Sequence, residues 1–293
     1  MIKKGIILAG GHGTRMSPLT KAVNKQLLPI YDKPLIYYPL SVLMLAGIKN
    51  ILIIVNKGQL KQFKKLIPSG KNLGIKIDFE EQLHPGGLPE AFIIGEKFIK
   101  KDNVALILGD NFFYGQSLGS KLKEGTKLKS GAKVFLHKVS KPELYGVAKI
   151  DKNKKIIKIV EKPKKFISDY AITGLYFFDN KVIKLAKTLK PSKRGETEII
   201  DLLNKYKNEK KLKVDFIGRG GAWLDTGSIK DFYNTSTFVS TIENRQGMKI
   251  ACLEEIAFDN KWIKRKEIQN SIKFYGNCDY SNYLKKLLVN AKF

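Results

Sequence analysis

The sequence predicts an α/β fold in which strands and helices alternate around a central sheet. Three continuous apolar runs carry this prediction, at residues 3–10, 50–55 and 103–110. Strands that are covered on both faces give such unbroken runs, whereas half-exposed strands alternate apolar and polar residues. Between the first two runs, residues 33–48 are expected to form a helix, because a proline stands near the start and a glycine near the end.

The later elements differ from these buried strands. Residues 74–82 alternate apolar and polar side chains, which predicts a less buried strand. From residue 131 to residue 178, strand-like runs follow one another without a long helix between them. This succession of strand-like runs predicts a small β-rich subregion inserted in the α/β body. Helical patterns return at residues 180–189 and 196–206, and the tail from Ile229 onward is expected to be mainly helical.

The charge of the chain suggests a polyanionic partner, but its composition argues against one. Lysine and arginine total 54 against 27 acidic residues, a formal net charge of +27. Only five of these basic residues are arginines, and the lysines are spread over the whole chain. Nucleic-acid binders concentrate basic residues and favour arginine, which grips phosphate bidentately. We therefore expect no specific nucleic-acid partner, and any DNA binding should be weak and lost with salt.

Neither a membrane nor a metal–cysteine site is predicted. No apolar stretch approaches the roughly 18 to 20 residues of a membrane helix, and the N-terminus lacks the apolar region of a signal peptide. We expect a soluble, cytoplasmic protein with no membrane partner. Cys252 and Cys278 lie too far apart for a redox or metal motif, so both are expected to be free thiols.

A glycine-rich loop follows the first strand. Gly10, Gly11 and Gly13 stand in it, and Arg15 comes directly after. Glycine allows backbone N–H groups to approach phosphate oxygens, and an arginine adds a planar, positively charged guanidinium group. The loop is neither a Walker motif nor a dinucleotide fingerprint, since Met16 stands where the latter needs glycine. On the glycines alone, a simple tight turn stays an equal alternative.

Further charged residues make the anion-binding interpretation stronger. Lys25 precedes two prolines that hold an extended path, so one loop would present two cations to one phosphate chain. Asp110 stands at the end of the third apolar run, and Asp225 lies in a turn next to glycine. Carboxylate and phosphate oxygens are the ligands that Mg²⁺ prefers. Each aspartate alone is more often a cap or turn former, whereas the pair beside a phosphate loop predicts a metal site.

Several motifs, taken in order, resemble the glucose-1-phosphate thymidylyltransferases, a family of sugar nucleotidyltransferases. The likeness runs from Lys3 to about Tyr283. The segments that carry it are GIILAGGHGTRMSPLT, NKQLLPIYDKPLIYYPLSVLMLAGI, LGDNFFYG, YGVAKID, VEKP, YAITGLYFFD, KPSKRGETEI, GRGGAWLDTGS and ENRQGMKIACLEEIAF.

The resemblance implies a Rossmann-like three-layer αβα sandwich with a mixed, mostly parallel central sheet. It divides the chain into a nucleotidyltransferase core, residues 1–240, and a helical tail, residues 241–293, that packs on the core. Within the core, residues 131–178 would form the inserted β-rich, sugar-binding subregion. The tail would support a homotetramer and feedback inhibition by a dTDP-sugar.

The family condenses dTTP with α-D-glucose 1-phosphate to give dTDP-glucose and pyrophosphate, a step that feeds dTDP-deoxysugar synthesis such as that of dTDP-rhamnose. The sugar phosphate attacks the α-phosphorus in line, so two anions must meet and catalysis should rest on positioning and cations. By resemblance, Arg15 and Lys25 would hold the triphosphate, and Lys162 would bind the sugar phosphate. Asp110 and Asp225 would carry the cofactor, Mg²⁺.

The resemblance also implies which residues bind the substrates. Gly10, Gly11 and Gly13 would give backbone N–H groups to the nucleotide, while Gln82 and the Gly87 backbone would read the edge of thymine. The remaining substrate-binding residues would be Asn111, Tyr145, Gly146, Glu161, Thr173, Gly174, Tyr176 and Arg194, most of them around the sugar.

Three departures from the family pattern put base selectivity and rate in question. His12 stands where the loop usually carries a small hydroxyl residue, and Asn24 replaces a usual serine. Glu90 replaces a usual glutamine next to an altered loop at residues 83–86. Two other functions stay open: transfer of UMP or CMP by a related enzyme, and a catalytically silent nucleotide-sugar or polyanion binder. Silent homologues typically lose the arginine, the lysine or a metal aspartate, and this sequence keeps them all.

Overall fold

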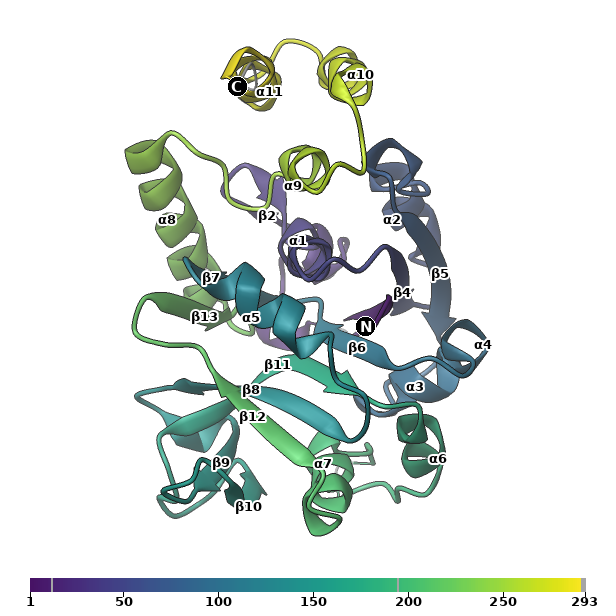
Figure 1. The fold of residues 1–293 in the computed structure, drawn as a ribbon, viewed down its shortest axis with the longest axis vertical. Coiled ribbons are helices and arrows are strands. Elements are labelled where there is room, and N and C mark those ends of the chain that lie inside the picture. The colour runs from purple at the N-terminus through teal and green to yellow at the C-terminus, as the bar shows by residue number, and fades with distance from the viewer. Residues whose placement is uncertain (12, 194, 291–293) are drawn as a thin grey trace.

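The computed structural model describes residues 1–11, 13–193 and 195–290. Helices cover both faces of a central sheet, as the sequence predicts (Figure 1). The strands are β1 (Lys4–Ala9), β2 (Pro29–Ile30), β3 (Lys33–Pro34), β4 (Asn50–Asn56), β5 (Lys76–Gln82), β6 (Val104–Leu108), β7 (Asn111–Gly115), β8 (Ala132–Lys138), β9 (Gly146–Ile150), β10 (Ile156–Glu161), β11 (Tyr170–Phe178), β12 (Leu212–Phe216) and β13 (Gly221–Asp225). The helices are α1 (Tyr37–Leu45), α2 (Leu60–Leu66), α3 (Glu90–Ile94), α4 (Glu96–Ile99), α5 (Leu118–Gly125), α6 (Lys181–Lys187), α7 (Ile199–Asn208), α8 (Ile229–Gln246), α9 (Leu253–Asp259), α10 (Arg265–Tyr275) and α11 (Asp279–Asn290).

The order of the strands brings several loops to one edge of the sheet. Over the described residues the central sheet has nine strands, in the order β10-β9-β11-β6-β1-β4-β5, with β8 paired to β11 and β12 paired to β8. The four strands β6, β1, β4 and β5 run parallel. Their carboxyl ends therefore lie at the same edge, where ligands of open α/β sheets bind.

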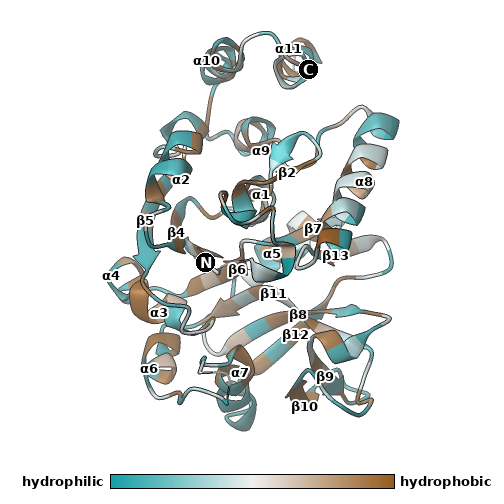
Figure 2. Ribbon diagram, turned by 180° about the vertical axis from the view of Figure 1, so that it is seen from behind, coloured by the Kyte–Doolittle hydropathy of each residue, from teal (hydrophilic) through white to brown (hydrophobic). Residues whose placement is uncertain are grey.

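The β-rich region between residues 131 and 178 extends this same sheet. β11 pairs antiparallel with β6, from Leu175 opposite Ile107 to Phe178 opposite Val104. Nearly every residue of β11 is buried, which agrees with a strand inside a sheet. At the opposite edge, β5 buries only Ile77 and Gln82 of its seven residues, and in Figure 2 it is mostly hydrophilic beside the hydrophobic β4. The less buried strand predicted over residues 74–82 is thus confirmed.

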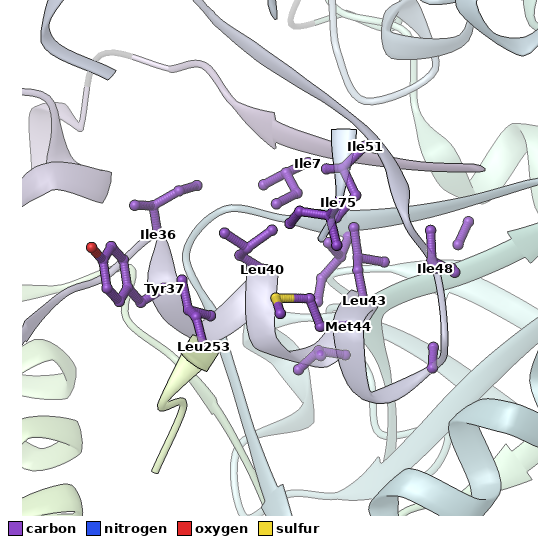
Figure 3. Close-up of a cluster of buried hydrophobic side chains, with 14 of the residues drawn as sticks. Ile7, Ile36, Tyr37, Leu40, Leu43, Met44, Ile48, Ile51, Ile75 and Leu253 are labelled. Carbon is purple, nitrogen blue, oxygen red and sulfur yellow. The ribbon is translucent and has the colours of Figure 1, made fainter. Parts of the chain in front are cut away.

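A separate apolar core lies on each face of the sheet. In Figure 3, Leu40 and Leu43 of α1 point toward Ile7 and Ile51 of the sheet, and Leu253 of α9 lies against the same helix. Helix α1 is buried along almost its whole length, because it has the sheet on one side and α9 on the other. On the second face, side chains of α3, α6 and α7 pack on the sheet.

A third, smaller core supports the loop that follows β1. It joins Met16 and Leu35 to Phe112 of β7 and Phe232 of α8. The tail is helical, as predicted: Ser228 caps the start of α8, and Gly247 ends it in a left-handed conformation with φ +68°. Helices α10 and α11 lie together beyond α9 (Figure 1). In the described part of the chain, no helix is both long and apolar enough to cross a membrane.

A buried charge cluster fastens the β2–β3 hairpin to α8. The Lys33 side chain is 2% exposed, and its Nζ donates to Glu243 Oε1 at 2.8 Å and to Asp32. Lys249 also bonds to Asp32 and lies 3.3 Å from Glu243 Oε2. Burial works against the Asp32 charge, but Lys33 and Lys249 together hold the pKa of this carboxyl below its usual value.

The Lys33→Met variant should be markedly less stable, because it leaves Glu243 buried with only part of its compensating charge. We expect the free energy of unfolding, measured in urea, to fall by about 3 kcal/mol. The matched control is Lys127→Met, whose lysine is exposed and pairs with the exposed Glu124. Its stability should not change measurably. Equal stability of the two variants would contradict the role given to the cluster.

Candidate active site

The glycine-rich loop is held in place by the end of the neighbouring strand. After β1 ends at Ala9, the backbone takes positive φ values of +93° at Gly11 and +58° at Gly13, which favour glycine. The side chain of Asn56, at the end of β4, accepts from Gly11 N at 2.8 Å and donates to Gly11 O at 2.9 Å. These bonds tie Gly11 to the end of β4, so its backbone lies beyond the carboxyl end of β1.

Arg15 lies beside one of the two predicted metal carboxylates. It is exposed, while its neighbour Met16 is fully buried in the third core and anchors the short helical turn Thr14–Met16. A Cβ added to Gly227 would stand 2.7 Å from Arg15 Nη2 and 3.1 Å from Asp225 Oδ2. The guanidinium and the carboxylate thus border the same glycine, which leaves room for both.

Lys25 is buried and paired with the other carboxylate. Its side chain is 5% exposed, and Nζ donates to Asp110 Oδ2 at 2.8 Å. The preceding Asn24 accepts from Gln26 N at 2.8 Å and donates to Ala9 O at 3.2 Å. The asparagine that departs from the family pattern therefore caps the turn that carries Lys25 and ties it to the end of β1.

Asp110 and Asp225 come together because β7 pairs antiparallel with β13. Asp225 stands opposite Asn111 in this pair, and Thr226 donates to Asp110 O from its backbone N at 3.1 Å and from its hydroxyl at 2.8 Å. Burial disfavours the Asp110 charge, but the neighbouring Lys25 holds the pKa of this carboxyl below its usual value. Burial, and then the charge of Asp110, raise the pKa of Asp225 to about 6.

Asn111 links this pair of carboxylates to the middle of β11. Its Oδ1 accepts from Gly174 N at 3.0 Å and from Trp223 Nε1 at 2.6 Å, and its Nδ2 donates to Asp110 Oδ1 at 3.1 Å. Two donors on one side fix which way the amide faces. The sequence analysis missed Trp223, although it stands in the same WLDTG motif as Asp225.

A cavity of about 200 Å³ opens between the glycine-rich loop and the end of β5. Its lining includes the predicted nucleotide-binding residues Gly10, Gln82 and Gly87, together with Asp110. Gln26 lines it as well, and its buried Oε1 has no hydrogen-bond partner among the described residues. Gln26 was also missed by the sequence analysis, and its position directly after Lys25 was the available signal.

Four of the predicted site residues form a group where β9 meets β10, here called the β9–β10 group: Tyr145, Gly146, Glu161 and Lys162. Gly146 pairs with Glu161 across these strands, and Lys162 N donates to Tyr145 O at 3.0 Å. The ammonium nitrogen of Lys162 lies 3.8 Å from Glu161 Oε1, and the Lys162 side chain is half exposed. The Tyr145 ring lies 5.1 Å from that of Trp223, so this group adjoins the carboxylate side of the site. Burial, and then the charge of Asp225, raise the pKa of Tyr145.

The remaining predicted residues differ in their surroundings. Thr173, on β11, is fully buried, and its hydroxyl has no partner within the described ranges. Tyr176, on the same strand, is 3% exposed and lies in the second core, with its ring 6.1 Å from that of Phe178. Arg194 and His12 lie outside the described residues.

The oxygen ligands at the site fit a metal that arrives with a phosphate substrate. Nowhere in the described ranges do three or more His, Cys, Asp or Glu side chains form a cluster that could hold a metal alone. Asp110 and Asp225 supply two carboxylates. Mg²⁺ is commonly held by one or two carboxylates, with phosphate oxygens and water completing its shell.

Comparison with known proteins decides the family. A model described as nucleotidyl transferase matches residues 4–242. A glucose-1-phosphate thymidylyltransferase from Neisseria meningitidis serogroup A is 50% identical over 285 residues, which cover 97% of this chain and 99% of that relative. The chain belongs to the glucose-1-phosphate thymidylyltransferase family. The resemblance seen in the sequence motifs is confirmed, and the chain is an enzyme of the nucleotidyltransferase class.

Other relatives agree with this family. A glucose-1-phosphate thymidylyltransferase from Xanthomonas campestris (strain B100) is 47% identical, with 97% of each chain covered. A Bacillus anthracis crystal structure assigned to the same activity superposes with a TM-score of 0.75 at 40% identity, covering 80% of this chain and 94% of that one. A UDP-glucose pyrophosphorylase with UDP-glucose superposes at 0.72 with 27% identity, covering 83% of this chain and 100% of that one.

Trp223→Phe should lower activity in this family member while leaving the fold intact. The variant keeps an aromatic ring beside Tyr145 but removes the donor that fixes Asn111, so Asp110 is held less firmly. We expect kcat/KM for nucleotidyl transfer to fall roughly tenfold, the factor that one hydrogen bond supplies. The matched control is Trp262→Phe, at the only other tryptophan of the chain. An unchanged kcat/KM in Trp223→Phe would refute the positioning role.

Proposed function

We propose that the enzyme transfers the thymidylyl group of dTTP to α-D-glucose 1-phosphate and releases pyrophosphate. One observation carries the proposal. At the carboxyl edge of the parallel strands, a fixed glycine-rich loop, Arg15 and the buried Lys25 lie together with Asp110 and Asp225. The likeness to relatives named for this reaction, over 97% of the chain, supports the same activity.

The triphosphate would lie along the glycine-rich loop. Backbone N–H groups of Gly10, Gly11 and Gly13 would donate to its oxygens, and the exposed guanidinium of Arg15 would add a positive charge. Lys25 would attract the phosphates from its buried position, where little water screens its charge. These groups would hold the α-phosphorus in place and balance the charge that grows on the leaving pyrophosphate.

Asp110 and Asp225 would hold Mg²⁺ against the phosphate oxygens. When bound, the metal supplies positive charge that offsets repulsion between the two substrates and favours departure of pyrophosphate. Asn111 would keep the Asp110 carboxylate aimed correctly, because its own amide is fixed by Trp223 and Gly174.

The sugar phosphate would be held by the β9–β10 group. Lys162 would bind its phosphate, while Glu161, the Gly146 backbone and the unpartnered hydroxyl of Thr173 would bond to sugar hydroxyls. A phosphate oxygen of the sugar forms the new bond to the α-phosphorus, and the bond to the β-phosphate bridging oxygen breaks. The attacking oxygen is already anionic, so no general base and no covalent enzyme intermediate are required.

The base and deoxyribose would occupy the 200 Å³ cavity. Gln82 and the Gly87 backbone would contact the edge of the base, and the unpartnered Gln26 oxygen would accept from a ribose hydroxyl. On the resemblance alone, we further propose that residues 241–293 contribute to a homotetramer with feedback inhibition by a dTDP-sugar.

A panel of nucleoside triphosphates with glucose 1-phosphate, followed by pyrophosphate release, tests the base. We expect dTTP to be the best substrate and UTP a measurable second, because one methyl group in an apolar pocket is worth about 1 to 3 kcal/mol. Higher efficiency with CTP or GTP than with dTTP would rule out thymidylyl transfer. Preference for UTP would support the uridylyl alternative.

Asp110→Asn should remove Mg²⁺-dependent turnover while leaving the fold intact. The change deletes one of the two converging carboxylates and the charge that pairs with Lys25, so kcat should fall at least about 100-fold. Asp78→Asn, at an exposed aspartate paired with Lys76, is the matched control and should keep full activity. Near-normal Mg²⁺-dependent activity in Asp110→Asn would show that the metal assignment is wrong.

A further inference from the structure

A carboxylate that does not line the cavity determines how Gln82 faces it. Gln82 ends β5 and is 5% exposed, and its Nε2 donates to Glu90 Oε2. The same Glu90 oxygen accepts from Gly86 N at 2.9 Å. Glu90 begins α3, so one side chain joins the end of β5, the following loop and the next helix.

The hydrogen bond to Glu90 fixes the orientation of the Gln82 amide. A carboxylate accepts hydrogen bonds and has no proton to donate, so only the NH₂ group of Gln82 can face it. The amide oxygen must then point the other way. It does: a Cβ added to Gly10 would stand 2.5 Å from Gln82 Oε1, and Gly10 and Gln82 both line the 200 Å³ cavity.

A backbone donor lines the same cavity. Gly87 adopts φ +99°, and a Cβ there would stand 2.0 Å from Thr197 O. The carbonyl of Gly86 accepts from Thr197 N at 2.9 Å and from the Thr197 hydroxyl at 2.8 Å. These bonds hold the segment in place, and Gly87 lines the same cavity as Gln82.

We propose that Glu90 is a positioning residue that selects the hydrogen-bonding edge of the base through the amide of Gln82. The inference rests on the proposed function, since it deepens the account of the same cavity. An acceptor from Gln82 and a donor from Gly87 match a base whose ring N3 carries a proton next to a carbonyl, as in thymine and uracil. Cytosine presents an unprotonated N3, whose lone pair would face the Gln82 oxygen.

A carboxylate at position 90 strengthens the selection of thymine or uracil over cytosine. A glutamine at this position could accept from Gln82 through its oxygen or donate to it through its nitrogen. The flipped orientation of the Gln82 amide would then keep its hydrogen bond to residue 90, at the cost of the bond from Gly86 N, and the flipped amide would donate to the N3 of cytosine. Buried polar groups left unpaired by the wrong substrate are the strongest source of discrimination in such sites. The departure at Glu90 thus sharpens the choice of base.

The test compares dTTP with 5-methyl-dCTP, which differs from dTTP only at the base edge and keeps the methyl group. The Glu90→Gln variant and the wild-type enzyme are assayed with glucose 1-phosphate and Mg²⁺. We expect the ratio of kcat/KM for dTTP to that for 5-methyl-dCTP to fall about tenfold in Glu90→Gln. The matched control is Glu96→Gln, at an exposed glutamate paired with Lys187, whose ratio should stay at the wild-type value.

A second variant keeps the test decisive. Gln82→Met removes the amide that would contact the base, so the ratio of kcat/KM for dTTP to that for 5-methyl-dCTP should also fall in this variant. Adding Glu90→Gln to Gln82→Met should change this ratio no further. A Glu90→Gln variant that loses efficiency equally with both nucleotides, or an undiminished ratio in Gln82→Met, would overturn the inference. These outcomes differ from failure of the proposed function, in which the wild-type enzyme itself would not use dTTP.

Discussion

The buried ion pair between Lys25 and Asp110 is the contact on which the site depends. This pair joins the turn that carries Lys25 to Asp110, which lies just beyond the end of β6. Lys25 Nζ and Asp110 Oδ2 are 2.8 Å apart, and the Lys25 side chain is almost fully buried. A buried ammonium needs a compensating charge, and a partly buried carboxylate beside it is held in its ionised form. One interaction therefore fixes, at the same place, the cation proposed to bind phosphate and the carboxylate proposed to bind the metal.

The rest of the site is joined to this pair by hydrogen bonds from two asparagine side chains. Asn24 ties the Lys25 turn to Ala9, and Asn111 ties Asp110 to Gly174 and Trp223. Pairing of β7 with β13 then brings Asp225 to the site, and the third core beneath Met16 holds the loop that carries Arg15. Amide side chains suit this work because each one donates and accepts in fixed directions.

Two departures from the family pattern acquire physical meaning in this arrangement. Asn24 replaces a usual serine, and its longer side chain reaches Gln26 N and Ala9 O at once. Glu90 replaces a usual glutamine, and as a pure acceptor it bonds to Gln82 and Gly86. Both residues bond to a residue that lines the 200 Å³ cavity, and neither change deletes one of the groups proposed to bind phosphate.

The sequence by itself determined the α/β class and the family, because these depend on local patterns: unbroken apolar runs and motifs in a fixed order. It also predicted Arg15, Lys25, Asp110 and Asp225 as members of one site. Only the tertiary structure placed β11 beside β6, so that the β-rich region continues the central sheet. Only it revealed Trp223 and Gln26, and only it showed that Glu90 bonds to Gln82, because a hydrogen bond between particular side chains, or an unpartnered buried oxygen, leaves no periodic trace in the sequence.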